Sequence, residues 1–237
     1  MDASFVIPVK GRLKHLKETI VSKLEQETEF NFEVLVVDYN CPDKTDNWCR
    51  KHKHPKLRSI TVPAPIDYFN NSHCRNVGAL YADGDILCFS DADCFLDPDW
   101  LGYVLDTMKQ DLSIVGAGND FMEDDDQLGR GTWAVRKTVW RRLRGYDETM
   151  EGWGGEELDF FWRMKRAGNI LAFPREYAWT IKHGDEERIK YYDCKNKHTT
   201  NMINLRSLGM RGTVNPNGFG DKYKNTKSFR DNYLTSH

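Results

Sequence analysis

The chain has 237 residues, of which 39% are hydrophobic and 30% charged, and its formal net charge is -2. This length fits one large α/β domain, and the near-neutral charge gives no global field that would favour nucleic acid or a membrane surface. The longest apolar runs are strand-sized and fall well short of the ~20 residues that a membrane span needs. The six cysteines form no CxxC pair, which argues against a structural zinc site and favours reduced thiols.

The first half of the chain alternates strand and helix signals. Buried strands are expected at residues 5–9, 33–38, 58–62 and 86–90. Helices are expected at residues 13–25, where apolar residues recur at helical spacing, at 43–52, and at 72–81 with Ser72 as the N-cap. This alternation predicts a mostly parallel sheet with right-handed crossovers, in which ligands gather beyond the carboxyl ends of the strands.

The second half is less regular. Helices are expected at residues 99–109, directly after 135, and at 154–166 with a stop at Gly168. Short strands are expected at 113–117, 132–135, 170–173 and 178–182. We therefore predict one α/β domain over residues 1–205, with a nucleotide-binding half at about 1–95 and an acceptor and catalytic half at about 96–205. Residues 206–237, where Lys and Arg outnumber Asp, are expected to form a basic C-terminal extension.

Two carboxylates, Asp91 and Asp93, follow the apolar strand expected at 86–90. Residues i and i+2 of an extended chain point the same way, so both side chains can face one ligand. Clustered carboxylates repel each other unless a cation or hydrogen-bond donors neutralise them, and a hard divalent cation bound with a diphosphate does so naturally. The alternative is an Asp-rich turn that only caps the next helix, because a bare DxD is a common pattern.

Three glycines surround Trp153, and Glu156 and Glu157 then open a helix. Glycines allow a close approach of the backbone to a ligand, and the tryptophan is well placed as a platform for a sugar. A carboxylate in the first helical turn is favoured as the anion and can act as general base toward an acceptor hydroxyl. The alternative is an ordinary glycine turn before an acidic helix start. His183 ends another expected strand and becomes a candidate ligand only in the company of these segments.

The order of these segments resembles known glycosyltransferases. Residues 6–16 (ValIleProValLysGlyArgLeuLysHisLeu) are similar to the nucleotide-binding opening of the β-1,4-galactosyltransferases. ArgAsnValGlyAla at 75–79, before SerAspAlaAsp at 90–93, is similar to that family and to the family 2 glycosyltransferases. GlyTrpGlyGlyGluGluLeuAsp at 152–159 resembles the acceptor-side WGGEDDD motif, and ThrIleLysHis at 180–183 resembles the metal-binding MIRH segment. The resemblance spans residues 5 to about 210.

This resemblance implies a single-domain GT-A fold, Rossmann-like with helices flanking the central sheet, an inverting mechanism, Mn(II) or Mg(II), and a UDP-sugar donor. It assigns the metal to Asp93 and His183, the acceptor to Trp153 and Gly155, and catalysis to Glu157. Glu156 is the second catalytic candidate. The implied donor contacts are Pro8, Val9, Lys10, Arg12, Arg75, Asn76 and Asp91. From the residues themselves, Asp38 at the end of the second expected strand is a further candidate to accept hydrogen bonds from a uracil or ribose.

Two positions depart from the galactosyltransferase pattern. Thr180 stands where that family has a methionine metal ligand, and exchange of a soft thioether for a hard hydroxyl can alter metal preference. Whether Thr180 binds metal is left open. Glu157 stands where the family has its catalytic aspartate, which keeps the chemistry on a longer arm.

We therefore predict a metal-dependent inverting transferase that moves a hexose or N-acetylhexosamine from a UDP-sugar to a hydroxyl, in particular that of a glycan. Three alternatives stay open: a nucleotidyltransferase, a carbohydrate-binding module on a dead transferase fold, and an enzyme that glycosylates modified nucleic-acid bases. Nucleic acid is the least favoured acceptor, because runs of basic residues are more often solvated surface. No stem or membrane anchor is recognised, so a cytoplasmic bacterial or viral enzyme is expected rather than a Golgi enzyme. The polar segment after His183 is expected to close over the donor as a lid. The sugar, the acceptor and the oligomeric state are open.

Overall fold

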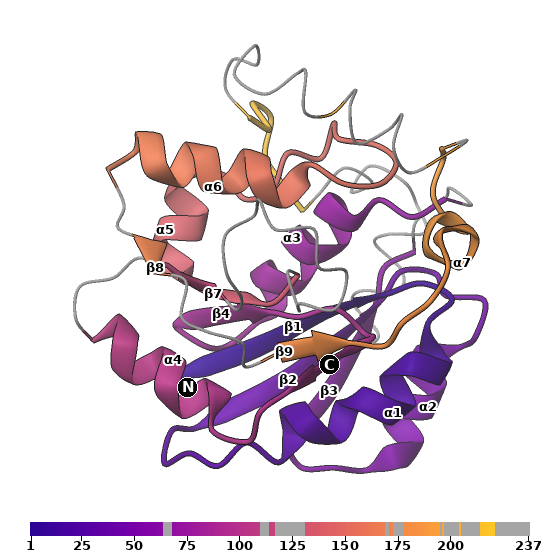
Figure 1. Ribbon diagram of the computed structural model, residues 1–237, viewed down its shortest axis with the longest axis horizontal. Coiled ribbons are helices and arrows are strands. Elements are labelled where there is room, and N and C mark those ends of the chain that lie inside the picture. The colour runs from indigo at the N-terminus through magenta and orange to yellow at the C-terminus, as the bar shows by residue number, and fades with distance from the viewer. Residues whose placement is uncertain are drawn as a thin grey trace.

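A computed structural model describes residues 1–63, 68–109, 114–116, 131–168, 171–172, 178–194, 196, 204 and 214–220 of the chain. Over these residues the chain forms one large sheet, with strand order β3-β2-β1-β4-β7-β6-β8, and a two-stranded sheet of β5 and β9 (Figure 1). Most of the predicted basic extension at 206–237 lies outside the described residues.

The large sheet consists of β1 (Ala3–Val9), β2 (Phe32–Asp38), β3 (Leu57–Thr61), β4 (Ile86–Phe89), β6 (Ile114–Gly116), β7 (Trp133–Arg136) and β8 (Leu171–Ala172). The small sheet consists of β5 (Cys94–Leu96) and β9 (Ala178–Thr180). The helices are α1 (Leu13–Leu24), α2 (Thr45–His52), α3 (Asn71–Tyr81), α4 (Trp100–Met108), α5 (Lys137–Arg142), α6 (Glu156–Arg166) and α7 (Asp185–Ile189).

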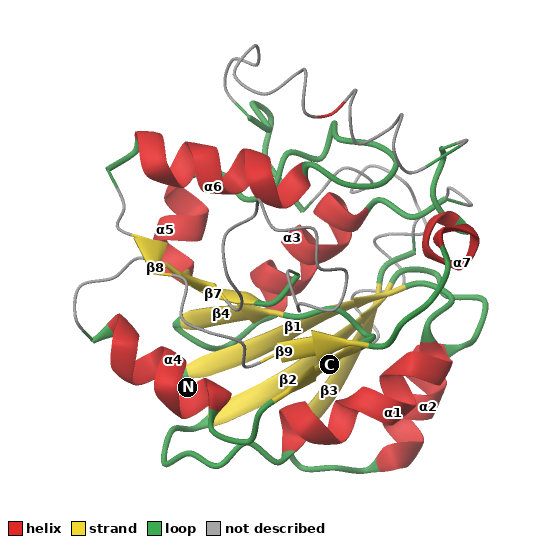
Figure 2. Cartoon of the chain, in the orientation of Figure 1, coloured by secondary structure: helices red, strands yellow, loops and turns green. Residues whose placement is uncertain are grey.

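Helices cover both faces of the large sheet, and each face has its own apolar core (Figure 2). Successive side chains of a strand point to opposite faces. Phe5 and Ile7 of β1 therefore pack with α1 and α4, whereas Val6 packs on the other face with α3, α5 and α6. β1 is fully buried and apolar except for Ser4, which follows from this two-sided cover and is expected for a strand in the middle of an α/β sheet.

The register brings the predicted donor residues to one edge of the sheet. β1 pairs in parallel with β2, so that Val9 lies opposite Asp38, and with β4, so that Val6 lies opposite Phe89. The carboxyl ends of these strands therefore meet at the same edge, where an open α/β sheet places its ligands. β7 runs antiparallel to both β4 and β6, whereas the other pairs of the large sheet are parallel. The predicted mostly parallel α/β architecture is confirmed.

One local expectation was wrong, and two short elements were not predicted. Asn70, and not Ser72, caps α3, because its side chain accepts the backbone N–H of His73 while Ser72 lies inside the helix. β5 follows the DxD directly and was not predicted, since three residues are too few to show an alternating pattern. The polar segment after His183 contains the short helix α7, which was not predicted either. Among the described residues, no helix combines the length and the apolar character needed to cross a bilayer.

Candidate active site

Arg75 of α3 occupies the centre of the predicted site. Its guanidinium is fully buried and donates through Nη2 to Oδ1 of Asp91 at 2.7 Å and through Nη1 to Oε1 of Glu157 at 2.5 Å. The Tyr146 hydroxyl also accepts from Nη1 at 3.3 Å. One cation thereby joins the DxD turn after β4 to the first turn of α6, two segments from different halves of the chain.

Burial raises the pKa of Glu157 to about 7, with the charges of Glu156 and Asp91 acting in the same direction and that of Arg75 opposing them. The Glu157 side chain keeps 23% of its surface exposed, so it remains reachable from solvent. Burial likewise raises the pKa of Asp91 against the opposing charge of Arg75. A carboxylate with a pKa near neutrality is suited to accept a proton during turnover.

Asp93 and His183 form the second pair of the site. Nε2 of His183, three residues after the end of β9, lies 2.7 Å from Oδ2 of Asp93, directly before β5. Burial raises the pKa of Asp93, but the hydrogen bond from His183 and the positive charges of His183 and Arg12 outweigh it and lower the pKa overall. Pairing of β5 with β9 positions both residues, because Cys94 lies opposite Thr180.

This pair has the chemistry of a partial metal site. A carboxylate oxygen and an imidazole nitrogen suit Mn(II) or Mg(II) when phosphate oxygens and water complete the shell. Nδ1 of His183 is buried and has no hydrogen-bond partner among the described residues, so the ring is not yet fully satisfied. No three His, Cys, Asp or Glu side chains gather into a metal cage in the part of the chain that the structure describes. The residues present therefore fit a metal only as two ligands beside a bound diphosphate.

The chain after His183 folds back over the end of β1. Arg12 donates to the backbone carbonyl of Glu187 of α7 at 2.8 Å and forms an ion pair with the Glu187 carboxylate at 3.2 Å. The same carboxylate lies 3.5 Å from Nε2 of His15. The His15 ring stacks on that of His183, with centroids 5.5 Å apart. The ring of Tyr191 fills the space that a Cβ on Gly11 would take, so the glycine permits this close approach. Arg12 therefore has its observed partner in α7, and its predicted donor contact stays a prediction.

The glycine turn at 152–155 adopts a backbone that only glycine takes without strain, with φ of 78° at Gly152, 85° at Gly154 and 94° at Gly155. Asn204 holds this turn by donating to the Gly154 carbonyl at 2.6 Å. Trp153 is half-buried, and the Arg188 guanidinium lies 5.8 Å from its ring centroid. The backbone conformation thus requires these glycines for the turn itself, which is the alternative interpretation that the sequence left open.

The two acidic residues at the start of α6 have different surroundings. Glu156 is buried and accepts the Asn71 amide at 3.0 Å, whereas Glu157 pairs with Arg75. Both lie on the side of α6 that meets the N-terminal end of α3. The two carboxylates therefore differ in position. Asn71 holds Glu156, whereas Glu157 extends toward Asp91 through their shared partner Arg75.

Other predicted donor residues lie at the same edge of the sheet, but their polar side chains form hydrogen bonds within the protein. Asp38 accepts the backbone N–H groups of Cys41 at 2.7 Å and Asp46 at 2.8 Å, and so shapes the loop after β2. Lys10 donates to the Tyr39 carbonyl at 3.2 Å. Pro8 and Val9 are buried, which leaves backbone groups for contacts.

Asn76 lies deeper than the sequence suggested. Its fully buried amide donates to the Tyr146 carbonyl and to Glu148, both at 2.9 Å, and its oxygen accepts the Tyr146 N–H at 2.8 Å. These bonds hold the turn that carries Tyr146 against α3. The geometry thus gives Asn76 a supporting place behind Arg75, and its predicted donor contact stays a prediction.

Sequence reasoning missed Asn71, Tyr146 and Gly131. The first two become significant only through the partners that the fold supplies, Glu156 and Arg75. Gly131 packs against the Asp91 carboxylate so closely that a Cβ there would collide with it. Its position just before a predicted strand was the only available signal, and many glycines share it.

Comparisons with known proteins agree with this geometry. Residues 4–208 match the model of glycosyl transferase family 2. The hyaluronan synthase of Pasteurella multocida is 23% identical over 225 residues, which cover 71% of this chain and 23% of that protein. The chain therefore spans less than a quarter of this curated relative.

Two solved structures show the same fold at low identity. S. aureus TarS in complex with UDP-GlcNAc aligns with a TM-score of 0.59 at 18% identity, over 79% of this chain and 61% of that chain. The catalytic domain of Drosophila β1,4-galactosyltransferase 7, in complex with xylobiose, aligns with a TM-score of 0.61 at 16% identity, over 89% and 82%. These likenesses confirm the predicted GT-A fold, and the match over residues 4–208 shows that the chain belongs to glycosyl transferase family 2.

Proposed function

We propose that the chain is a metal-dependent inverting glycosyltransferase that moves a hexose or N-acetylhexosamine from a UDP-sugar to a hydroxyl of a glycan. The carrying observation is the buried Arg75 bridge, which brings Asp91 and Glu157 into one site. Asp93 lies on the same turn as Asp91, and His183 contacts Asp93 from the segment after β9. A donor-side carboxylate, two metal ligands and a base are thereby gathered at the strand edge where α/β folds bind ligands.

Asp93 and His183 would hold Mn(II) or Mg(II) together with the diphosphate of the donor. When bound, the metal supplies positive charge that makes the diphosphate a better leaving group. Asp91, held by Arg75, faces the sugar or ribose of the donor. Pro8, Val9, Lys10 and Arg12 offer backbone and cationic groups to the nucleotide, and Asp38 shapes the adjoining loop.

Glu157 acts as general base. It removes the proton of the acceptor hydroxyl while the hydroxyl oxygen attacks the anomeric carbon from the face opposite the diphosphate. A new glycosidic C–O bond forms, the C–O bond to the diphosphate breaks, and UDP leaves with that electron pair. Attack from the opposite face inverts the anomeric configuration. Trp153 and Gly155 lie on the acceptor side, where an aromatic ring can stack on the apolar face of a sugar.

The names of the similar proteins support a uridine donor. TarS was solved with UDP-GlcNAc, and the curated relative is a hyaluronan synthase. The galactosyltransferase was solved with xylobiose, which is a disaccharide. We propose the corresponding classes here, a UDP-sugar donor and a carbohydrate acceptor.

The test is a screen of UDP-hexoses and UDP-N-acetylhexosamines for UDP release with Mn(II), with EDTA, and with mono- and oligosaccharide acceptors. We expect UDP release from at least one donor, dependent on the metal and increased by an acceptor. Thermal protection by UDP should exceed that by GDP, ADP or CDP. Donor binding without UDP release would favour a carbohydrate-binding module, and release of pyrophosphate from a nucleoside triphosphate would favour a nucleotidyltransferase.

A further inference from the structure

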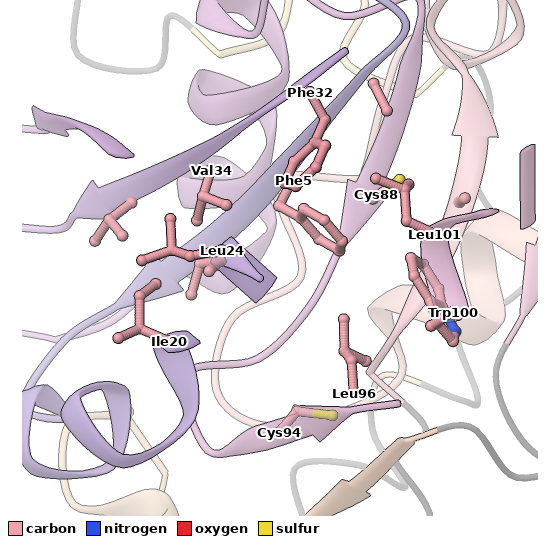
Figure 3. Close-up of a cluster of buried hydrophobic side chains, with 14 of the residues drawn as sticks. Phe5, Ile20, Leu24, Phe32, Val34, Cys88, Cys94, Leu96, Trp100 and Leu101 are labelled. Atoms are coloured by element: carbon pink, nitrogen blue, oxygen red, sulfur yellow. The ribbon is translucent and has the colours of Figure 1, made fainter. Parts of the chain in front are cut away.

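The short strand β5, which begins directly after Asp93, has an unusual neighbour on one edge. Its other edge pairs with β9, and the backbone N–H of Ile181 donates to the Asp93 carbonyl at 2.8 Å. In a larger sheet a further strand would satisfy the free edge. Here α1 lies against it instead: Ile20 and Leu24 of α1 enter the same core as Cys94 and Leu96 of β5 (Figure 3).

Side chains of α1 and of the residues just after it satisfy that edge of β5. The hydroxyl of Thr19 donates to the Ala92 carbonyl at 2.7 Å, and the ammonium of Lys23 donates to the Cys94 carbonyl. The hydroxyl of Ser22 accepts the Leu96 N–H at 3.2 Å. Gln26 continues the row by donating to the Asp97 carbonyl at 2.8 Å and accepting the Leu101 N–H at 2.7 Å.

The spacing of these residues is that of one helical face, with steps of three and four from Thr19 through Ser22 and Lys23 to Gln26. The Cys94 carbonyl and the Leu96 N–H belong to alternate residues of β5, so they point to the same side. The Ala92 carbonyl belongs to the turn before β5 and meets the same helix through Thr19. This row of polar side chains thus takes the place of a neighbouring strand. It forms hydrogen bonds with the backbone on both sides of Asp93, at Ala92 and Cys94.

Lys23 is the least expected member of this row, because it is fully buried among apolar side chains. A buried ammonium is costly unless hydrogen bonds and opposite charge compensate it. The ammonium donates to the Cys94 carbonyl. Burial lowers the pKa of Lys23 to about 8, and the carboxylates of Asp93 and Asp91 act in the opposite direction by favouring its charged form. An apolar side chain would be enough to fill this space, so packing alone does not require a lysine. The positive charge instead matches the two carboxylates of the turn that carries Asp91 and Asp93.

We propose that Thr19 and Lys23 are positioning residues for the metal-binding turn: they fix the backbone at Ala92 and Cys94 and thereby set where the Asp93 carboxylate stands. This inference rests on the proposed metal site. Both side chains are fully buried. Groups that orient metal ligands commonly change metal affinity by about 10–100-fold when they are removed.

The test measures metal affinity rather than turnover. Mn(II) is titrated into the protein with a fixed concentration of UDP, and binding is followed by calorimetry and by the electron paramagnetic resonance of free Mn(II). Thr19→Val and Lys23→Met should each raise the Mn(II) concentration for half-maximal binding by about tenfold or more. Thr19→Val removes a hydrogen bond without changing charge, so it separates positioning from electrostatics and decides the question if Lys23→Met fails to fold.

Two controls separate positioning from general weakening of α1. Ile20→Val lies between the two residues and trims the same core without touching the backbone of the turn, so it should lower the Tm and leave the Mn(II) requirement unchanged. Lys14→Met makes the same charge change on the exposed side of α1 and should alter neither. An unchanged Mn(II) requirement in Thr19→Val, with metal-dependent binding intact in the unmodified protein, would overturn the inference alone. UDP binding by the unmodified protein that ignores Mn(II) would overturn the proposed metal site and this inference with it.

Discussion

The donor edge and the acceptor turn hold their residues by different means. At the donor edge, β1 pairs in parallel with β2 and with β4. The turn after β4 is held by side-chain hydrogen bonds from α1, such as that of Thr19 to the Ala92 carbonyl. The acceptor turn at 152–157 is held by a few long-range side chains, namely Asn204, Asn71 and Arg75. Backbone ladders fix position firmly, whereas a turn held by single contacts can adjust. We therefore expect substitutions at the donor edge to change nucleotide binding and those at the acceptor turn to change turnover.

Arg75 joins the two regions, so its loss should have the largest effect. Arg75→Met leaves Asp91 and Glu157 without their cation, and breaking a buried ion pair in this way typically costs about 3–5 kcal/mol. We expect about 3 kcal/mol, near the lower limit, because 39% of the Asp91 side chain is exposed and water relieves part of the loss. Urea unfolding measures the change. Arg141→Met, an exposed arginine on α5, is the control, and equal losses in the two variants would argue against the bridge.

Glu157→Gln tests the acceptor side alone. The amide keeps the size of the side chain but cannot take up a proton, so turnover should fall by about 10²-fold or more while UDP affinity stays unchanged. Steady-state UDP release and calorimetry give the two quantities. Glu156→Gln is the matched control, since that carboxylate bonds to Asn71 instead. If Glu156→Gln is inactive and Glu157→Gln is active, the general base is Glu156 and the assignment to Glu157 is wrong.

The pH profile gives a smaller and more specific effect. The base must be ionised to work, and burial raises the pKa of Glu157 to about 7. Activity should therefore be full above pH 7 and fall about tenfold per pH unit well below it, and this acid limb should disappear from the residual activity of Glu157→Gln. A profile that stays flat from pH 8 to pH 5 would contradict the assignment.

The lid prediction concerns the contact between the two regions at α7. Glu187 of α7 meets Arg12, and Arg188 lies over Trp153, so α7 bridges the donor edge and the acceptor turn. Donor and metal bound at His183 would add a tether at the base of this segment. We expect trypsin to cut near Arg188 or Lys190 in the free protein, and Mn(II) with UDP-sugar to slow that cut severalfold. Equal cleavage rates at saturating donor would mean that the segment is not a lid.

The sequence predicted the donor edge better than the acceptor turn for a physical reason. β1 and α1 show their burial in the spacing of apolar residues, and Asp91 and Asp93 follow from a strand end, which is local information. The pairing of Arg75 with Glu157 depends on how α3 and α6 meet, and no spacing along the chain contains it. The same holds for the Lys23 contact with β5, because a lysine in an amphipathic helix is ordinarily exposed.

Asp93→Ala with UDP and Mn(II) tests the central claim most directly, since that claim is a metal-bound nucleotide at the donor edge. We predict that calorimetry will show Mn(II)-dependent UDP binding in the unmodified protein and none in Asp93→Ala, with the circular dichroism spectrum unchanged. Asp99→Ala, an exposed carboxylate next to α4, should bind UDP normally. Unchanged UDP affinity of Asp93→Ala in Mn(II) would contradict the account.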